Sequence, residues 1–597
     1  SREKNKNGFV GFRLKGLSQN INAVGAKINV FVQGQILSKE IIPARGFQSS
    51  VDYKQIFGLG QFKKIDSVQV IWPNLTQSIL KIQKLDTVYT IDQAKQTTTP
   101  FVVVEQKVAP LFEEVKNNFE KHTEDDHVDF YAERIIPRIL SQEGPKAASA
   151  DLNGDGLADI FIGGANNKGS QIYLQTSNGD FKPKPQAAFA AFTSYEDVAA
   201  VCFDADKDGD MDLLVGSGGN NRLSTRGELN HRLFLNDGKA NFTHKADAFP
   251  VFEYNTGVMV PLDYDLDGDL DVFVGARNTP LKYGVTPSSA LYQNNGQGQF
   301  KDVTKTVAPD FASLGMVTSA VVGKLNNKAG VSLVVVGEYM YPMVYAFKKG
   351  KMVEQVTNLK EMYGWWQSIH MADIDGDGYQ DFIIGNMGEN GYLKPTPRTP
   401  VKLWINDFDG NESIDKILTR TIDGRDVPVF LKGEMQEQIP LLKKENLNYE
   451  IYAKKSFQEL FKKELIDKAA MKLYNFTSSI IAWGKGNGQF DIQRLPNEVQ
   501  FSSLNAMVSV DVNADGKLDL VMGGNQFGFL PQFGRLDANY GLVLINKGKR
   551  ILDVVEDKQS GLTITGQVRD MLLIQQPKQK GVLFIRNNQY PVFMKIK

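Results

Sequence analysis

The sequence predicts an all-β protein in which a seven-bladed β-propeller follows a small β-sandwich-like domain and carries a helical insertion in one blade. Two observations lead to the propeller. A nine-residue acidic loop recurs along residues 144–597, and its first three copies start at residues 151, 204 and 263, which are 53 and 59 residues apart. Each copy lies between short apolar segments, and each unit repeats two further strands around a glycine-containing hairpin. Four short strands per repeat of this length are typical of propeller blades.

The first 95 residues predict the small β domain. Residues 8–14, 26–32 and 67–72 alternate apolar and polar side chains with a period of two, and Pro73 ends the last of these strands. Residues 96–143 are predicted to be a connector with one helix over 110–121. We interpret the polar stretch 122–127, with its two histidines, as a solvated loop rather than a metal site, because charge-rich loops between domains are common.

The acidic loops have the chemistry of a hard-cation site. Loop positions 1, 3, 5 and 9 carry carboxylate or amide oxygens, and glycine at position 6 permits a sharp turn. Oxygen donors at alternate positions of a tight loop suit Ca²⁺, so we predict up to six calcium sites. The predicted ligands are Asp151, Asn153, Asp155 and Asp159; Asp204, Asp206, Asp208 and Asp212; Asp263, Asp265, Asp267 and Asp271; Asp373, Asp375, Asp377 and Asp381; Asp407, Asp409, Asn411 and Asp415; and Asp511, Asn513, Asp515 and Asp519.

An EF-hand is the main competing interpretation, and the twelfth loop position argues against it. An EF-hand needs a bidentate glutamate there, whereas all six loops have an apolar residue. Two further repeats, around residues 323–330 and 575–580, lack the carboxylates, and we predict that neither binds metal. Because the loop recurs in most blades and two blades lack it, we expect calcium to stabilise turns rather than to capture a ligand.

The fifth unit is interrupted after Trp404. Residues 406–475 are predicted to be an insertion that begins with the sixth acidic loop, in which Glu412 replaces the usual glycine. Residues 456–470 carry apolar side chains three and four positions apart, which predicts a helix. We expect this insertion to provide a partner-specific surface.

Glycine-rich turns follow the strand after each metal loop, so we expect them on the opposite face of the propeller, around its central opening. This face is the predicted ligand face. Aromatic side chains next to amides and a carboxylate could stack on a sugar or grip a peptide; the alternative is that the two tryptophans fill the propeller core. The residues predicted to lie there are Trp365, Trp366, Asn386, Glu389, Asn390 and Arg535.

Composition excludes several classes of protein. Among 597 residues there are 68 Lys and Arg against 69 Asp and Glu, which argues against a nucleic-acid partner. The chain has one cysteine, Cys202, so no intrachain disulfide can form. No apolar run is long enough for a transmembrane span. We find no Ser/His/Asp or Cys/His signature and predict no enzyme activity; Glu389, Asp537 and Arg535 are the only candidates for catalytic groups.

Several motifs resemble known families. Residues 20–27, 46–50, 57–60 and 70–73 resemble the ASPIC/UnbV domain, and the acidic loops resemble the FG-GAP/VCBS calcium loops of integrin-α-like propellers. Further motifs lie at 133–137, 140–145, 406–411 and 585–588. With them, the chain resembles long Bacteroidota proteins that join these two modules and are similar in architecture to cartilage acidic protein. Relatives often have alanine where this chain has Ile585. In such relatives further sequence commonly precedes the ASPIC/UnbV domain, so we expect the chain to be the C-terminal part of a longer protein.

The resemblance implies an outer-membrane lipoprotein on the extracellular face of the cell surface, associated with a SusC/SusD-like TonB-dependent transporter. We therefore predict a non-catalytic, calcium-stabilised binding or assembly protein. The alternative is an extracellular polysaccharide-active enzyme or a lectin-like, glycan-binding propeller, since propellers host both.

Overall fold

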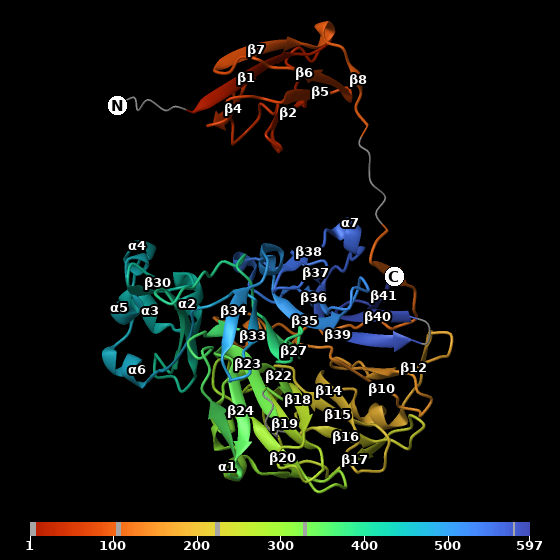
Figure 1. Cartoon of the computed structure of the whole chain (residues 1–597). Helices are drawn as coiled ribbons and strands as arrows, with labels where there is room; N and C mark the ends of the chain where they lie inside the picture. The colour runs from red at the N-terminus through yellow and green to blue at the C-terminus, as the bar shows by residue number, and fades with distance from the viewer. Residues whose placement is uncertain (1–6, 103–108, 221–226, 326–330, 577–578) are drawn as a thin grey trace. The chain divides into compact units, whose positions relative to one another are not determined.

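The computed structural model describes residues 7–102, 109–220, 227–325, 331–576 and 579–597. The chain forms two compact units, Ser1–Lys107 and Val108–Lys597 (Figure 1). Strands dominate both units, and helices are short. The prediction of an all-β protein is confirmed.

The first unit consists of two sheets packed around one core. Alternate residues of the predicted strands point inward, and Phe12 and Trp72 are among the largest buried side chains. The Trp72 indole donates a hydrogen bond of 2.9 Å to Ser78 Oγ, which satisfies its buried N–H. One sheet has the order β4 (Gln55–Gly60), β1 (Gly8–Lys15), β7 (Thr87–Asp92); the other has the order β3 (Gln35–Glu40), β2 (Lys27–Val32), β5 (Ser67–Ile71), β6 (Thr76–Leu80), β8 (Thr99–Pro100).

In the described part of the second unit, seven sheets that each bring four antiparallel strands together form a ring, and an eighth sheet belongs to the insertion. The first strand of each sheet contacts the first strand of the next, and β39 contacts β10, so the sheets close into a ring. The sheets are β10 (Ala147–Ala150), β11 (Asp159–Ile162), β12 (Gln171–Gln175), β13 (Phe181–Pro183); β14 (Asp197–Phe203), β15 (Asp212–Ser217), β16 (Arg232–Leu235), β17 (Thr243–Lys245); β18 (Asn255–Leu262), β19 (Asp271–Asn278), β20 (Ala290–Asn294), β21 (Phe300–Asp302); β22 (Met316–Gly323), β23 (Ser332–Met340), β24 (Met343–Lys348), β25 (Lys351–Gln355); β27 (Ser368–Ala372), β28 (Asp381–Gly385), β33 (Ile480–Gly484), β34 (Phe490–Arg494); β35 (Leu504–Val510), β36 (Asp519–Gly524), β37 (Leu542–Asn546), β38 (Leu552–Val554); and β39 (Gln567–Gln576), β40 (Gln579–Asn587), β41 (Val592–Ile596), β9 (Phe112–Val115).

The last sheet corrects the prediction for residues 96–143. Instead of a helix over 110–121, Phe112–Val115 forms strand β9, which pairs antiparallel with β41 at the other end of the chain. Residues 99–100 pair with β6 of the first unit. Two short segments of this stretch, residues 99–100 and 112–115, therefore pair with the edge strands of two sheets.

The insertion corrects a second prediction. The third strand of the fifth sheet is β33, not the segment around Trp404, so the inserted segment lies between β28 and β33. It forms its own sheet with the order β31 (Arg425–Pro428), β30 (Asp415–Ile422), β29 (Val401–Asn406), β32 (Ala470–Tyr474). Its helices are α2 (Lys432–Gln438), α3 (Leu441–Glu445), α4 (Tyr449–Ala453), α5 (Phe457–Leu460) and α6 (Lys463–Lys468). Outside the insertion, the described part of the second unit has two further short helices, α1 (Thr304–Val307) and α7 (Asp557–Ser560). Strand β26 (Gly364–Trp365) pairs with β23 as a fifth strand of the fourth sheet.

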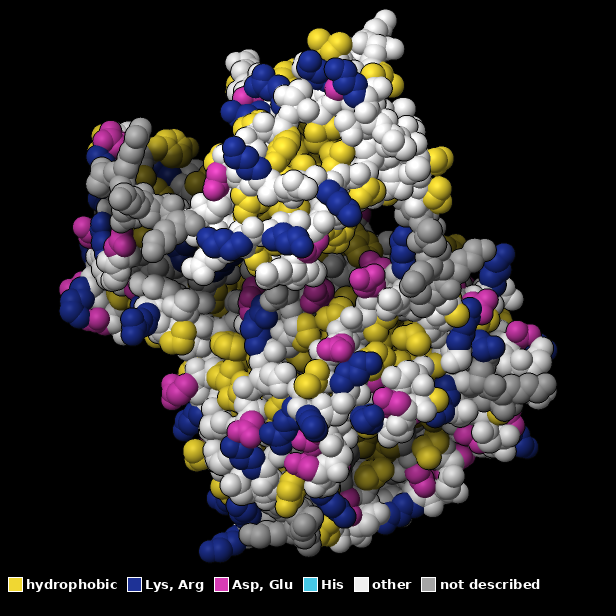
Figure 2. Space-filling model, turned by 45° about the horizontal axis from the view of Figure 1, so that its top comes forward, with side chains coloured by type: hydrophobic (Ala, Val, Ile, Leu, Met, Phe, Trp, Pro, Cys, Tyr) yellow, Lys and Arg dark blue, Asp and Glu magenta, His cyan; other side chains and the backbone are white. Residues whose placement is uncertain are grey.

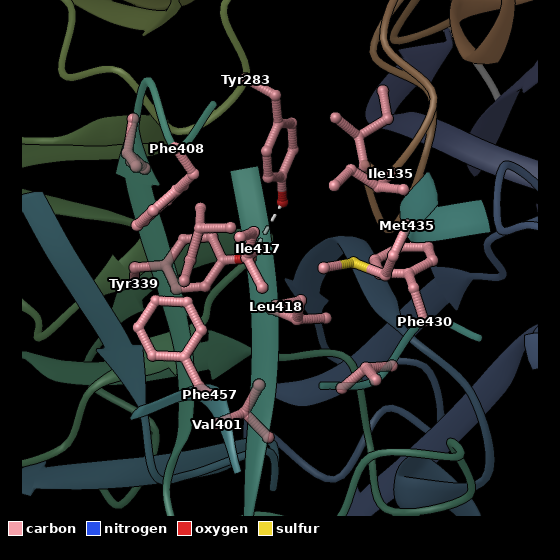
Figure 3. Packing of buried hydrophobic residues seen from close by; sticks show 14 of the residues in the cluster. Ile135, Tyr283, Tyr339, Val401, Phe408, Ile417, Leu418, Phe430, Met435 and Phe457 are labelled. Carbon is pink, nitrogen blue, oxygen red and sulfur yellow. Dashed lines mark hydrogen bonds between the residues drawn. The ribbon is translucent and has the colours of Figure 1, made fainter. Parts of the chain in front are cut away.

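The prediction of a single helix over 456–470 is wrong, because this stretch forms two separate helices, α5 and α6. Phe461 is extended between them (φ −126°, ψ 149°). This break turns the Phe461 ring onto Phe408 and Phe457, and tertiary packing thus overrides the helical pattern. Figure 3 shows the resulting core, in which insertion residues such as Ile417 and Met435 lie beside Tyr339 of β23 and Ile135 of the segment before β10. The insertion is thereby anchored to the propeller.

Charge is divided unevenly between the units. Residues 1–107 contain 15 Lys and Arg but only 7 Asp and Glu, so the remaining residues carry 53 basic against 62 acidic side chains. The near-zero net charge of the chain therefore combines a basic first unit with an acidic second unit. Figure 2 shows basic and acidic side chains interspersed over the visible face of the second unit.

Buried His231 should make stability depend on pH. Its ring packs against Phe249, Phe252 and Tyr292, and burial lowers its pKa to about 3. Between about pH 6.5 and 3 the imidazole is protonated in the unfolded chain but neutral in the folded protein. The free energy of unfolding is therefore unaffected by His231 above about pH 6.5 and decreases as the pH drops towards 4. We expect His231→Phe to flatten this dependence by about 1.4 kcal/mol per pH unit. Urea unfolding at several pH values measures how the free energy of unfolding changes with pH. Equal slopes for the wild type and the variant would contradict the role given to His231.

Candidate functional site

Each acidic loop connects two neighbouring antiparallel strands. Five lie between the first and second strands of ring sheets, and the sixth lies between β29 and β30 of the insertion. In four loops the carboxylates at positions 1, 3 and 9 approach within 4.8 Å of one another: Asp204, Asp206 and Asp212; Asp263, Asp265 and Asp271; Asp373, Asp375 and Asp381; and Asp407, Asp409 and Asp415. These clusters could each hold a metal ion.

The first carboxylate of each loop organises the turn. Asp373 accepts backbone hydrogen bonds from Gly376 and Asp377 at Oδ1 (2.8 and 3.1 Å) and from Gly378 at Oδ2 (2.9 Å). Gly378 at position 6 has a φ of 88°, which explains the glycine there. In the sixth loop Glu412 takes this left-handed conformation at φ 64° and donates the equivalent bond to Asp407. The turn therefore forms there without glycine.

The ninth-position aspartate is a buried backbone clasp. In the third ring sheet Asp271 is fully buried, and it accepts one hydrogen bond from Tyr264 N in the loop (3.3 Å) and one from Asn294 N on the third strand (2.9 Å). The same arrangement occurs at Asp159, Asp212, Asp381 and Asp519. In the insertion, Gln438 of α2 replaces the third-strand amide at Asp415.

Side chains at the ends of third strands also connect three of the loops to the following sheet. Asn294 Nδ2 donates to the Ala205 carbonyl of the preceding sheet's loop at 2.8 Å. Asn236 reaches Leu152 at 2.8 Å, and Asn546 reaches Ile374 at 2.6 Å, in the same way. Sequence reasoning missed this role, although the asparagine stands at the same place in three repeats. The loops therefore contribute to contacts between sheets as well as within them.

The donor set fits a divalent cation. Buried oxygens Oδ1 of Asp206, Asp263, Asp265 and Asp409 have no hydrogen-bond partner in the described structure. Burial raises the pKa of Asp212 and of Asp271 to about 7, although backbone hydrogen bonds oppose the shift. Clustered, partly unsatisfied carboxylates are costly without a counter-charge, and hard oxygen donors are the ligands that Ca²⁺ prefers.

Two sets of predicted ligands stand apart from these clusters. The position-5 residues are not members of the four groups; Asp377 Oδ1, for example, accepts from Tyr379 N at 2.9 Å. The loops at 151–159 and 511–519 have asparagine at position 3 and form no three-carboxylate group.

Arg550 Nε lies 2.7 Å from Asp375 Oδ2 and partly neutralises the loop at 373–381. Of the two loops predicted to lack metal, residues 326–330 and 577–578 lie outside the described residues.

We expect Asp271→Asn to destabilise the fold by about 3 kcal/mol even with calcium removed, because asparagine has one acceptor oxygen and leaves one of the two buried backbone N–H groups without a partner. The matched control is Asp267→Asn in the same loop. Asp267 is exposed, and the asparagine keeps an oxygen to accept from Asp269 N (2.9 Å in the wild type). Guanidinium unfolding in EGTA measures both variants, and equal losses would contradict a clasp that works without metal.

The predicted ligand-face residues are divided between the core and the surface. Trp366 and Asn386 are completely buried: the Trp366 indole donates to the Met362 carbonyl, and Asn386 Nδ2 donates to Phe476 O. Trp366 is thus a core residue, and Asn386 fixes backbone. Glu389 forms a bidentate ion pair with Arg494 (2.6 and 2.8 Å), Asn390 donates to Phe501 O, and Arg535 pairs with Asp537 at 2.6 Å. These three remain at the surface.

Trp365 lies at an apolar pocket of about 40 Å³. It stacks on Tyr474 of the insertion at 4.7 Å, and Tyr392 stacks on Phe533 at 5.5 Å. Because residues 387–393 follow β28, whose other end bears a metal loop, the pocket lies at the end of the sheet opposite that loop. Sequence reasoning missed most of the lining, although aromatic residues beside the glycine turns signalled it: Pro137, Met387, Gly388, Gly391, Tyr392, Leu393, Tyr474, Thr477, Phe529, Phe533, Gly534 and Leu536.

Comparison with protein families agrees with this architecture. Residues 16–98 match the ASPIC and UnbV family, residues 151–215 match an FG-GAP-like repeat, and residues 365–397 match an FG-GAP repeat. The second unit therefore contains FG-GAP repeats, and its sheets form a ring of the β-propeller type. The first unit contains an ASPIC and UnbV domain. FG-GAP repeats are typical of propeller proteins with binding or adhesion roles.

Solved structures with similarity are distant. The Vibrio cholerae biofilm matrix protein Bap1 is 9% identical, with 77% of this chain and 88% of that chain covered and a TM-score of 0.34. BBS1N in complex with ARL6DN is 9% identical (82% and 98% covered, TM-score 0.35), and YCF48 bound to D1 peptide is 7% identical (77% and 95% covered, TM-score 0.36). No curated protein matches significantly. Among the described helices, none has the length and apolar character needed to cross a membrane.

Proposed function

We propose that this chain is a non-catalytic binding protein that works at the outside of the cell and is stabilised by Ca²⁺ in its acidic loops. Four three-carboxylate clusters, three of which include an unpartnered buried oxygen, support calcium as the ion. Loops of this kind in extracellular modules bind with a Kd on the order of 10⁻⁴–10⁻³ M, which matches a compartment rich in calcium. The sequence motifs resemble those of Bacteroidota propeller proteins, and on that basis a SusC/SusD-like TonB-dependent transporter is the proposed partner and the chain is proposed to be a lipoprotein or part of one.

The observation that carries the binding role is the aromatic pocket at Trp365. Tyr392 is 47% exposed at its rim, and the Arg420 guanidinium lies over the Tyr392 ring at 5.2 Å. Arg535 is exposed beside the pocket residue Gly534. Exposed aromatic rings flanked by charged groups are typical of recognition surfaces. A glycan or a peptide segment is the proposed ligand.

A polysaccharide-active enzyme is the second candidate, since Glu389 and Asp537 lie at the same end of the propeller. Both carboxylates are paired with arginine. Hydrogen bonds from Arg494 lower the pKa of Glu389, which keeps it ionised and unsuited to act as a general acid. This pairing favours binding over hydrolysis.

Purification from native membranes tests the proposal. We expect a TonB-dependent transporter to accompany the protein in stoichiometric amount, and Tyr392→Ala to weaken this association or the binding of a glycan. Tyr590→Ala is the matched control, because Tyr590 is 57% exposed and does not line the pocket. Turnover of any member of a glycan panel, abolished by Glu389→Gln, would overturn the non-catalytic role.

A further inference from the structure

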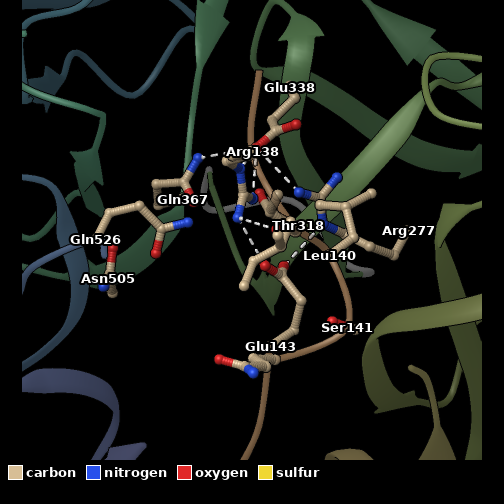
Figure 4. A network of polar contacts seen from close by, with 12 residues as sticks. Arg138, Leu140, Ser141, Glu143, Arg277, Thr318, Glu338, Gln367, Asn505 and Gln526 are labelled. Carbon is tan, nitrogen blue, oxygen red and sulfur yellow. Dashed lines mark hydrogen bonds and ion pairs between the residues drawn. The ribbon is translucent and has the colours of Figure 1, made fainter. Parts of the chain in front are cut away.

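Residues 138–146 run along the axis of the propeller. Arg138 contacts Glu338 of the fourth sheet, Arg277 of the third sheet contacts Glu143, and Arg569 of the last sheet donates to the Gln142 carbonyl at 2.9 Å. These sheets are distributed around the ring, so the segment lies near its centre, where the first strands contact one another. Figure 4 shows Arg138 and Glu143 of the segment among Arg277, Glu338 and Gln367. The segment continues into β10 and therefore occupies one end of the central channel.

The segment brings several ionised groups into a buried network. Arg138 is completely buried and donates to Glu338 Oε1 from Nε (3.0 Å) and Nη2 (2.6 Å), and to Glu143 Oε1 from Nη1 (2.7 Å). Arg277 Nε donates to Glu143 Oε2 at 3.0 Å, and its Nη2 lies 2.9 Å from Glu338 Oε1. The arginines outweigh the effect of burial and lower the pKa of both glutamates. Both carboxylates are thus ionised and engaged.

A cavity of about 40 Å³ adjoins this network. Three of its lining side chains are at least nine-tenths buried and have a polar atom without a hydrogen-bond partner in the described structure: Arg277 Nη1, Arg569 Nε and Thr256 Oγ1. Lys146, Gln367 and Asn505 also line the cavity, and Glu143 is the one carboxylate in the lining. Unsatisfied guanidinium donors are expensive to bury, so their convergence on one cavity calls for an acceptor.

We propose that this axial cavity binds one compact anion, either a free inorganic ion or the carboxylate group of a small molecule. Arg277, Arg569 and Lys146 face the cavity against the single carboxylate of Glu143, which Arg138 and Arg277 already engage. The Glu124 carboxylate, which does not line the cavity, attracts the Arg569 guanidinium electrostatically and accepts a hydrogen bond from Asn587 Nδ2. An ion of about the size of chloride fits a volume that holds roughly two or three waters. Guanidinium donors bind anions with charge-assisted hydrogen bonds.

Thermal unfolding of the full chain in halide salts tests this site. At constant ionic strength, we expect replacement of gluconate by chloride or bromide to raise the Tm along a saturating curve. In crystals soaked in bromide, we expect an anomalous peak between Arg277 Nη1, Arg569 Nε and Thr256 Oγ1. A parallel titration with acetate distinguishes the sources: competition by acetate for the bromide peak identifies a carboxylate site, and its failure identifies an inorganic-ion site.

Thr256→Val is the decisive variant, because it removes one donor while preserving shape and leaving the ion pairs intact. We expect it to weaken the apparent halide affinity about tenfold. Thr318→Val is the matched control: Thr318 lines the same cavity, but its hydroxyl already donates to Trp366 O at 2.8 Å, so halide affinity should be unchanged. Identical, non-saturating responses to gluconate and chloride, or no bromide peak in the cavity, would overturn the proposal.

Discussion

Removal of calcium is expected to lower the melting temperature by on the order of 10 °C. At 10 mM Ca²⁺ and a Kd on the order of 10⁻⁴–10⁻³ M, each occupied loop contributes about 1.4–2.7 kcal/mol. Four loops have a three-carboxylate cluster, and two of these loops, at 204–212 and 373–381, are also bonded to the following sheet through Asn294 and Asn546. Several loops acting together therefore exceed the effect of a typical point mutation. Differential scanning calorimetry in calcium and in EGTA measures the shift.

Variants of single loops separate calcium from general charge effects. Asp265→Ala removes a position-3 ligand whose Oδ1 is unpartnered, whereas Asp310→Ala removes an acidic residue that lies outside the loops. The first variant should reduce the calcium-dependent part of the Tm, and the second should leave it unchanged. Magnesium should replace calcium poorly, because it demands octahedral geometry at shorter distances. An unchanged Tm in EGTA would refute structural calcium.

Glu338→Ala is expected to destabilise the propeller by about 3–5 kcal/mol, because it leaves Arg138 and Arg277 buried with an uncompensated charge. Glu338 is fully buried and receives hydrogen bonds from Arg138 at 3.0 and 2.6 Å. Glu143 would be left to pair with both arginines.

Glu389→Ala is the matched control for this change. Glu389 also forms a two-point pair with an arginine, but both side chains are about 40% exposed. Water screens such pairs, so we expect a loss below about 1 kcal/mol. Chemical denaturation compares the two variants, and similar losses would show that burial of the axial network does not govern its contribution.

The sequence by itself determined the features that depend on local chemistry. Alternating and apolar strands gave the positions of β1, β2 and β5 and of the strands on either side of each acidic loop. The loop motif specified its own turn, because Asp373 binds amides only three to five residues away and Gly378 supplies the positive φ. Short-range hydrogen bonds of this kind are encoded within nine residues, so they can be predicted without the fold.

Only the tertiary structure decided which distant segments meet. Strand β9 closes the last sheet through a partner about 480 residues away, and residues 138–146 enter the channel to meet Glu338 and Arg569. Trp365 and Trp366 are adjacent in sequence and both buried, yet Trp365 packs in the core cluster shared with the insertion and lines the pocket, whereas Trp366 packs in a different cluster between the fourth and fifth sheets. Their environments depend on which strands and inserted residues pack around them. Such long-range packing satisfies buried groups that no local pattern records.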